Sequence, residues 1–211
     1  MVRITKNRSD RRRGFTLAET IIILVILSVL AAMIVPSLSG YVRTSKEQGE
    51  QAKALLAMDS MQVVMNNLRL KKLSALTPGS ADWTSASSND TNKALGDQVI
   101  SSMGLSRDTE PYLLVIGCGD SSVYEKDPAK RYTVYFVAYA VSEDSDAWFY
   151  VSGGEWTHKN PLKTGTMTAA VTGDTISTNI AKVDGANVGI QLYVISNHAG
   201  GNVLTVLNSY S

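Results

Sequence analysis

Hydrophobic residues divide the chain into two parts with different patterns. From Phe15 to Val42 the sequence is apolar, and Glu19 is its only charged residue. Its most apolar part, residues 15–35, would form a helix about 31 Å long at about 1.5 Å per residue, close to the roughly 30 Å of a bilayer's hydrocarbon core. A cleaved secretory signal usually has an apolar run of only about 7–15 residues. The pattern therefore predicts a membrane-spanning helix.

After Tyr41 the helical pattern continues but becomes amphipathic. Apolar residues recur at steps of three or four between charged and amide side chains, as a helix with one buried face requires: Leu55, Met58, Met61, Met65 and Leu68. We expect one long N-terminal helix over residues 15–73, which Pro36 bends and Thr77-Pro-Gly79 ends. Its first part, 15–35, would span the membrane, and its second part, 36–73, would pack on the remaining domain.

Residues 74–211 would form a globular head. Its first stretch, 74–93, is rich in Ser, Thr, Asp and Asn and predicts a surface loop, and residues 94–103 predict a short helix. Six later runs have the composition of strands: Tyr112–Ile116, Tyr132–Val141, Ala147–Val151, Met167–Val171, Val188–Ile195 and Val203–Leu207. Strands clustered after one long helix predict an α+β fold with an antiparallel sheet.

The charges are distributed unevenly along the chain. Residues 1–14 carry a net charge of +5, which leaves about −4 on the remainder of a chain whose total is +1. Because basic flanks stay in the cytoplasm, the predicted helix would pass once through the cytoplasmic membrane with its N-terminus inside and the head exported. An acidic head offers no basic face for nucleic acid, so we expect no direct nucleic-acid partner.

Glu19 is unusual for a membrane helix. A carboxylate at the bilayer centre costs about 2.5–3.5 kcal/mol, and such residues usually have a partner. Two plain alternatives are a secretory signal covering residues 15–31 and a one-pass anchor. Neither accounts for Glu19, or for the abrupt start of the apolar run at Gly14-Phe15, directly after three arginines.

The run Gly14-Phe15-Thr16-Leu17-Ala18-Glu19 resembles the processing site of type IV pilins and of the pseudopilins of type II secretion and competence systems. The resemblance implies that a membrane peptidase removes the leader, residues 1–14, between Gly14 and Phe15 and methylates the new amino group of Phe15. It implies that Glu19 then neutralises the terminal ammonium of a neighbouring subunit during assembly. Pro36 lies where pilins tend to carry a helix-kinking proline.

The same resemblance implies the partners and the location. The chain would polymerise with itself into a helical filament, after contact with the prepilin peptidase/N-methyltransferase, an assembly platform protein and an ATPase. It would move from the cytoplasmic membrane to a cell-surface filament. We expect a structural pilin for adhesion or motility, with no enzymatic activity and no cofactor. The alternatives are a pseudopilin of a secretion or DNA-uptake system and, more distantly, a secreted or membrane-tethered binding protein or enzyme.

The head sequence contains little reactive chemistry. Its single cysteine, Cys118, lies in an apolar run and predicts a buried thiol, so the disulfide that closes many pilin heads cannot form. His158 and His198 have no metal ligand at a useful spacing. Glu143, Asp144 and Asp146 could offer oxygens to Ca²⁺, but an exposed acidic turn is the ordinary explanation, and no metal site is predicted.

Overall fold

The computed structural model describes residues 15–70, 90–120, 123–172, 175–183 and 186–210. The chain divides into two compact units, Met1–Glu47 and Gln48–Ser211, which are considered separately below. The last residues of the predicted long helix, 71–73, and its predicted stop signal, 77–79, lie outside the described residues. Most of the predicted loop 74–93 does so as well.

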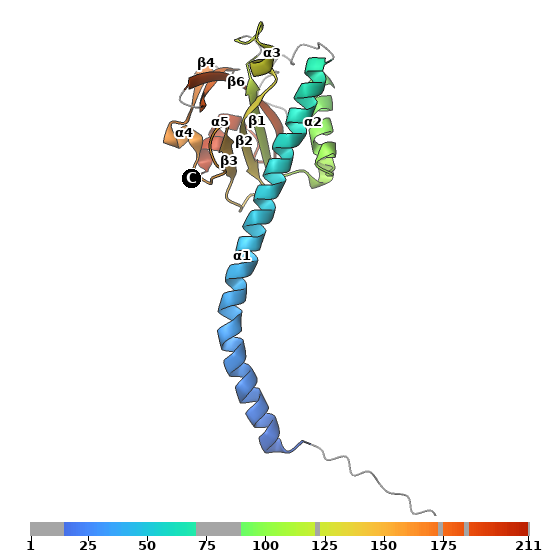
Figure 1. Cartoon of the computed structure of the whole chain (residues 1–211), viewed down its shortest axis with the longest axis vertical. Coiled ribbons are helices and arrows are strands. Elements are labelled where there is room, and N and C mark those ends of the chain that lie inside the picture. Colours follow the sequence, from blue (N-terminus) through green and yellow to red (C-terminus); the bar gives the residue numbers. More distant parts are fainter. Residues whose placement is uncertain (1–14, 71–89, 121–122, 173–174, 184–185, 211) are drawn as a thin grey trace, which may run out of the picture. The chain divides into compact units, whose positions relative to one another are not determined.

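Helix α1, Leu17–Leu70, confirms the predicted long N-terminal helix. Figure 1 shows it as one uninterrupted coil. Pro36 lies inside it, and because proline has no backbone N–H, the carbonyl one turn earlier loses its usual donor. The kink at Pro36 stays a prediction.

The second unit combines short helices with one sheet. Its helices are α2 (Asp90–Ser102), the 3₁₀ helix η1 (Arg107–Thr109), α3 (Pro128–Arg131), α4 (Pro161–Thr164) and α5 (Val203–Ser209). Its strands are β1 (Leu113–Gly119), β2 (Val134–Ala140), β3 (Trp148–Val151), β4 (Met167–Thr172), β5 (Thr175–Val183) and β6 (Ala186–Asn197). The strand order is β3-β2-β1-β6-β5-β4, and every neighbouring pair is antiparallel. The predicted α+β fold with an antiparallel sheet is confirmed.

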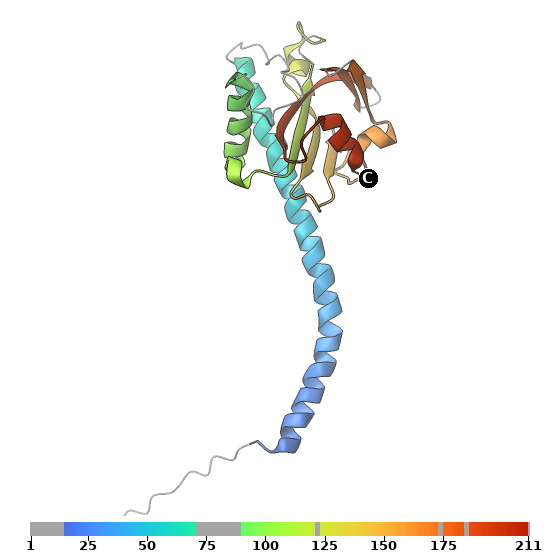
Figure 2. The ribbon, with the colours of Figure 1, turned by 180° about the vertical axis from the view of Figure 1, so that it is seen from behind.

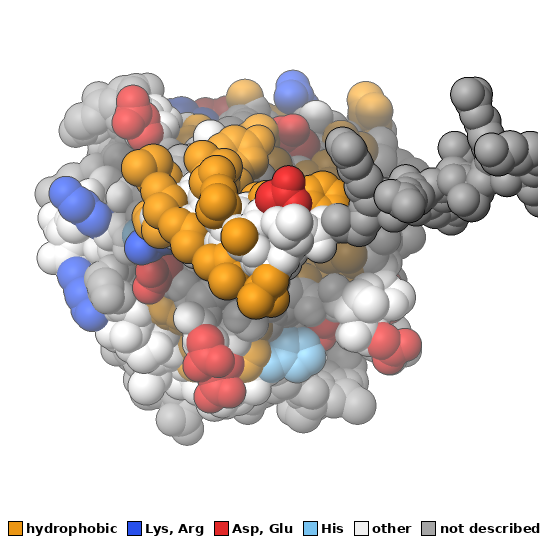
Figure 3. Space-filling view, turned by 90° about the horizontal axis from the view of Figure 1, so that it is seen from below, with side chains coloured by type: hydrophobic (Ala, Val, Ile, Leu, Met, Phe, Trp, Pro, Cys, Tyr) orange, Lys and Arg blue, Asp and Glu red, His pale blue; other side chains and the backbone are white. Residues whose placement is uncertain are grey.

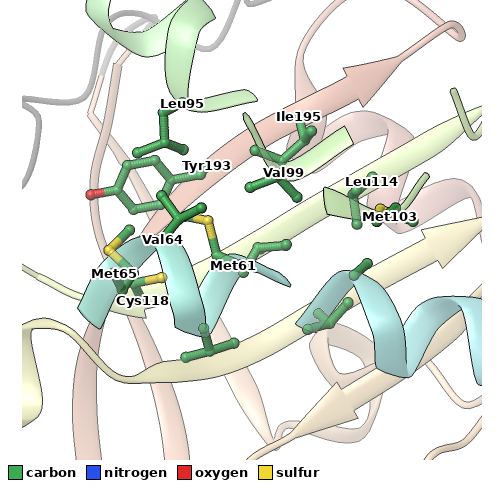
Figure 4. Close-up of a cluster of buried hydrophobic side chains, with 14 of the residues drawn as sticks. Met61, Val64, Met65, Leu95, Val99, Met103, Leu114, Cys118, Tyr193 and Ile195 are labelled. Atoms are coloured by element: carbon green, nitrogen blue, oxygen red, sulfur yellow. The ribbon is translucent and has the colours of Figure 1, made fainter. Parts of the chain in front are cut away.

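The sheet separates two hydrophobic cores. On one face, α2 and the later turns of α1 cover β1, β2 and β6, and Figures 1 and 4 show these helices against the strands. Met61 and Met65 of α1, Val99 of α2, and Cys118 and Tyr193 of the sheet meet in this core. The other face is covered by α5, the dark red helix in front of the strands in Figure 2. Leu162 of α4 packs on the same face. Both cores are built without a covalent cross-link, because Cys118 is the only cysteine.

Two predictions about the head were wrong, and one strand was not predicted. The run Val203–Leu207 is not a strand but most of helix α5, whose buried side chains follow a helical spacing: Val203, Leu204 and Leu207. The Asn202 side chain accepts a hydrogen bond from the Leu204 amide (2.9 Å) and so starts the helix. A short apolar run does not distinguish strand from helix, and the capping asparagine decides here.

The other two errors concern polar stretches. Strand β5 was missed because its sequence, Thr-Ile-Ser-Thr-Asn-Ile-Ala-Lys-Val, is largely polar, and pairing with β4 and β6 on either side makes it a strand. Helix α2 begins at Asp90, inside the predicted loop 74–93. The remaining strand predictions are confirmed, with ends shifted by a few residues.

Candidate assembly and processing site

The first unit exposes an unusually apolar surface. Each described side chain from Phe15 to Val42 is exposed, and the large hydrophobic ones range from 43% for Ile23 to 81% for Leu17. Figure 3 shows hydrophobic side chains gathered on this surface. Among the described residues, α1 is the one helix long and apolar enough to cross a membrane. Apolar surface of this extent requires a membrane or other protein to cover it.

Glu19 makes its polar contacts within the first turn of α1. One carboxylate oxygen, Oε2, accepts hydrogen bonds from the backbone N–H (2.8 Å) and the hydroxyl (2.9 Å) of Thr16. In return, the Glu19 amide donates to the Thr16 Oγ1 (3.2 Å). This reciprocal pair is a capping box, which satisfies donors that a helix N-terminus leaves unpaired. Sequence reasoning singled out Glu19 but missed Thr16, although the Thr-x-x-Glu spacing carries the signal.

The capping box positions a carboxylate close to the predicted cleavage point. Phe15, directly before Thr16, is 77% exposed, whereas Gly14 lies outside the described residues. After cleavage the Phe15 amino group would be largely protonated at neutral pH, with a reference pKa of about 7.7–8.0. A helix N-terminus also favours a negative side chain. The site can therefore present both a carboxylate and an ammonium within one turn of helix; cleavage, methylation and contact with a neighbouring subunit stay predictions.

The head residues considered for chemistry are accounted for by the fold. Cys118 is completely buried, and loss of hydration raises the pKa of its thiol, so the prediction of a buried, unreactive cysteine is confirmed. His158 Nδ1 lies 2.9 Å from the Ala147 carbonyl oxygen, and His198 Nε2 lies 3.1 Å from a Glu110 carboxylate oxygen. Each histidine thus has a structural contact.

The acidic turn has no support as a calcium site. Glu143, Asp144 and Asp146 are exposed, and the turn is closed by Ser145, whose amide and hydroxyl both donate to the Ser142 carbonyl. Within the described part of the chain, no group of three or more His, Cys, Asp or Glu residues lies close enough together to hold a metal ion.

Comparison with known proteins bears on the N-terminal region. A family model for the prokaryotic N-terminal methylation motif matches residues 9–35, which include Gly14, Phe15 and Glu19. The chain has a type IV pilin-like N-terminus. The pilin-like resemblance drawn from Gly14 to Glu19 is confirmed.

Curated relatives that match part of the chain are named type II secretion system core protein G. The chain is 38% identical over 60 residues to the type II secretion system core protein G of Pectobacterium carotovorum. This alignment covers 28% of the chain and 36% of the relative. The chain is 34% identical over 62 residues to the protein of the same name from Escherichia coli K12. That alignment covers 29% of the chain and 40% of the relative. The alignments thus span about two fifths of these relatives. No solved structure matches the chain.

Proposed function

We propose that this pilin-like chain is a structural subunit of a filament assembled from the cytoplasmic membrane, and that it is not an enzyme. The observation that carries the proposal is the combination of an exposed apolar segment of membrane length in α1 with Glu19 in its first turn. In a membrane the apolar surface is covered by lipid. In a filament it is covered by the same helix of other subunits, and the carboxylate can exchange its contact with Thr16 for an ammonium.

Processing would precede assembly. A prepilin peptidase would cut after Gly14 and methylate Phe15, and a platform protein and an ATPase would move the subunit from the membrane into the filament. The N-terminal methylation motif at residues 9–35 supports this order of events.

A pseudopilin of a type II secretion system is the version of this function that the comparisons favour, because the relatives described above are core protein G subunits of such systems. A pilin for adhesion or motility is the second candidate, since the same N-terminal segment serves both kinds of filament. Deleting the chain in its source organism separates the two. A pseudopilin is needed for release of secreted proteins into the medium, whereas a pilin is needed for surface fibres, adhesion or movement.

The mass of the mature N-terminus tests the proposal. We expect the chain, purified from its own membrane, to begin at Phe15 with one added methyl group. A chain in which Gly14→Val blocks cleavage should keep its leader and yield no filaments under electron microscopy. A mature chain that begins at Ala32, or a wild-type chain that keeps residues 1–14, would contradict the filament function and favour a secretory signal or a simple anchor.

A further inference from the structure

Four aromatic side chains follow one edge of the sheet. In β3, Trp148 and Tyr150 are half-buried and alternate with buried neighbours on the opposite face. Trp156 and His158 follow shortly after in the chain and are half-buried as well. We name Trp148, Tyr150, Trp156 and His158 the aromatic ladder.

Backbone pairing assembles the ladder. The segment after β3 turns back beside it, and Phe149 and Thr157 exchange two hydrogen bonds, N to O distances of 2.7 and 3.0 Å. Trp156 therefore stacks on Tyr150, with ring centroids 5.1 Å apart, and His158 packs on Trp148 at 3.9 Å. The rings are thus fixed in place by the sheet.

The ladder is incompletely covered. Trp148, Tyr150 and Trp156 pack against the core beneath α1 and α2, yet each stays partly open to solvent. The indole nitrogen of Trp148 is itself buried and has no hydrogen-bond partner among the described residues, so the open part of this side chain is its ring. Fixed, partly exposed tryptophan and tyrosine rings are the side chains that most often dominate protein–protein contacts.

A second uncovered surface lies on α1 within the same unit. Leu56 and Val63 are seven residues apart, hence on one face of the helix, and are 43% and 56% exposed. A surface helix normally places polar residues opposite its buried face. Lys53 and Asp59 are exposed beside them. We name Lys53, Leu56, Asp59 and Val63 the outer stripe.

The two surfaces have complementary charges. The ladder segment has Glu155 at its start and Lys159 at its end, whereas the outer stripe has Lys53 before Asp59. All four side chains are exposed, and none of them forms an ion pair with a described residue. Six residues of helix separate Lys53 from Asp59 by about 9 Å. The segment from Glu155 to Lys159, which bends at its end, spans at most about 13 Å, a difference that long side chains can bridge.

A filament requires this kind of pairing. A repeating contact that does not close on itself needs two different surfaces on each subunit, one complementary to the other. The ladder is aromatic and the stripe aliphatic, and their charges run in opposite order. We propose that the aromatic ladder of one subunit receives the outer stripe of a second copy of this chain, with Lys53 facing Glu155 and Asp59 facing Lys159. This inference rests on the proposed filament function.

Charge reversal in the full chain, expressed together with its assembly system, tests the contact. Lys53→Glu and Glu155→Lys should each lower the amount of sheared filament at least about fivefold, because each places like charges together. The double variant Lys53→Glu/Glu155→Lys should recover at least half of the wild-type amount. As matched controls, Lys126→Glu and Glu143→Lys reverse exposed charges outside both surfaces and should assemble normally.

A cysteine pair supplies an independent measurement. Because Cys118 is buried and is the only native cysteine, Lys53→Cys/Glu155→Cys should give a series of disulfide-linked oligomers on mild oxidation of filaments, and neither single variant should. Single reversals that assemble fully, a double reversal no better than either single one, or filaments without cross-links would overturn the inference. Absence of wild-type filaments would instead contradict the proposed function itself.

Discussion

Glu19 and Thr16 satisfy one another within a single turn of α1, through three hydrogen bonds of 2.8–3.2 Å. This compensates the carboxylate while the subunit stands alone. In the proposed filament, exchanging these bonds for the ammonium of another chain would require little movement of the side chain, because the carboxylate already lies at the end of the helix. The sequence identified Glu19 as a candidate functional residue, because it is the only charged residue in the apolar run from Phe15 to Val42. It did not predict the local partner, since a threonine there is inconspicuous.

Replacement of Glu19 by alanine should separate processing from assembly. We expect Glu19→Ala to be cut after Gly14 as before, but to yield filaments reduced at least about tenfold, because the neighbouring ammonium would be left as a buried charge without a partner. Mass spectrometry of the N-terminus and quantification of sheared filaments measure the two steps. The matched control is Glu47→Ala, which removes an exposed carboxylate whose 3.0 Å pair with Arg43 is worth little. Wild-type amounts of filament from Glu19→Ala would contradict the assigned role.

Asn160 ties the end of the chain to the head. It is 1% exposed, and its amide nitrogen donates to the carbonyl oxygens of Leu207 (2.6 Å) and Tyr210 (3.4 Å). Its side-chain oxygen accepts from the Leu162 amide (3.0 Å) and starts α4. In a head with a single, buried cysteine, this residue holds α5 by hydrogen bonds. The sequence near Asn160 gives no signal of that role, because its partners at the chain end, Leu207 and Tyr210, are backbone groups some fifty residues away.

Asn160→Ala should therefore destabilise the head by about 2–4 kcal/mol, since it leaves buried backbone groups unpaired and removes a helix cap. Urea unfolding followed by circular dichroism measures the loss. Asn202→Ala is the matched control: it removes only the cap of α5 and should cost about 1 kcal/mol. Equal losses for the two variants would show that the contacts of Asn160 with the chain end add nothing.

At the scale of elements, the periodicity of α1 predicted a helix well but placed its buried face imprecisely. Met61 and Met65 are buried as expected, whereas Leu55 is 43% exposed. Ala54 and Ala57, both fully buried, were overlooked. A search for large apolar residues misses the positions where a helix approaches a sheet most closely, because only small side chains fit there. The apolar pattern also fails to identify α5 and β5, because the Asn202 cap determines that the first is a helix and pairing with β4 and β6 determines that the second is a strand.

Two substitutions in α1 distinguish the observed face from the expected one. Met61→Ala should cost about 2–5 kcal/mol, because it opens a cavity beneath the helix. Leu55→Ala should cost less than about 1 kcal/mol, because much of its side chain is already in water. Urea unfolding of both variants provides the comparison. Equal costs would favour the face predicted from periodicity over the one that the structure shows.

At the scale of the whole molecule, packing and hydrogen bonds stabilise the head without a covalent cross-link, and phenols take part in that packing. Burial raises the pKa of Tyr193, Tyr135 and Tyr210, and it raises the pKa of Tyr139 to about 12. In each case the main cause is that the folded protein does not hydrate a phenolate well. The folded state therefore favours the neutral phenol.

The sign of the resulting pH dependence follows from proton binding. Below the unfolded-state pKa of about 10, both states are protonated and the stabilisation is complete. Above it the unfolded chain loses protons first, so the free energy of unfolding falls as the pH rises toward the folded-state pKa. We expect urea unfolding of the full chain in detergent to show similar stability at pH 7 and 9 and a steep loss between pH 10 and 12.

Tyr139→Phe should make this alkaline loss shallower. The substitution keeps the ring of a side chain that is 2% exposed and removes the hydroxyl, whose ionisation is unfavourable in the folded state. The stability of the variant should change little at pH 7. At pH 11 it should exceed that of the wild type. Tyr41→Phe is the matched control, since that ring is 75% exposed in the folded chain and meets similar solvent when the chain unfolds. Parallel pH profiles for wild type and Tyr139→Phe would show that burial of this phenol does not limit the alkaline stability of the head. If the pH profile of unfolding changes in Tyr139→Phe but not in Tyr41→Phe, the core beneath α1, and not the exposed apolar segment, determines the upper pH limit at which the head stays folded.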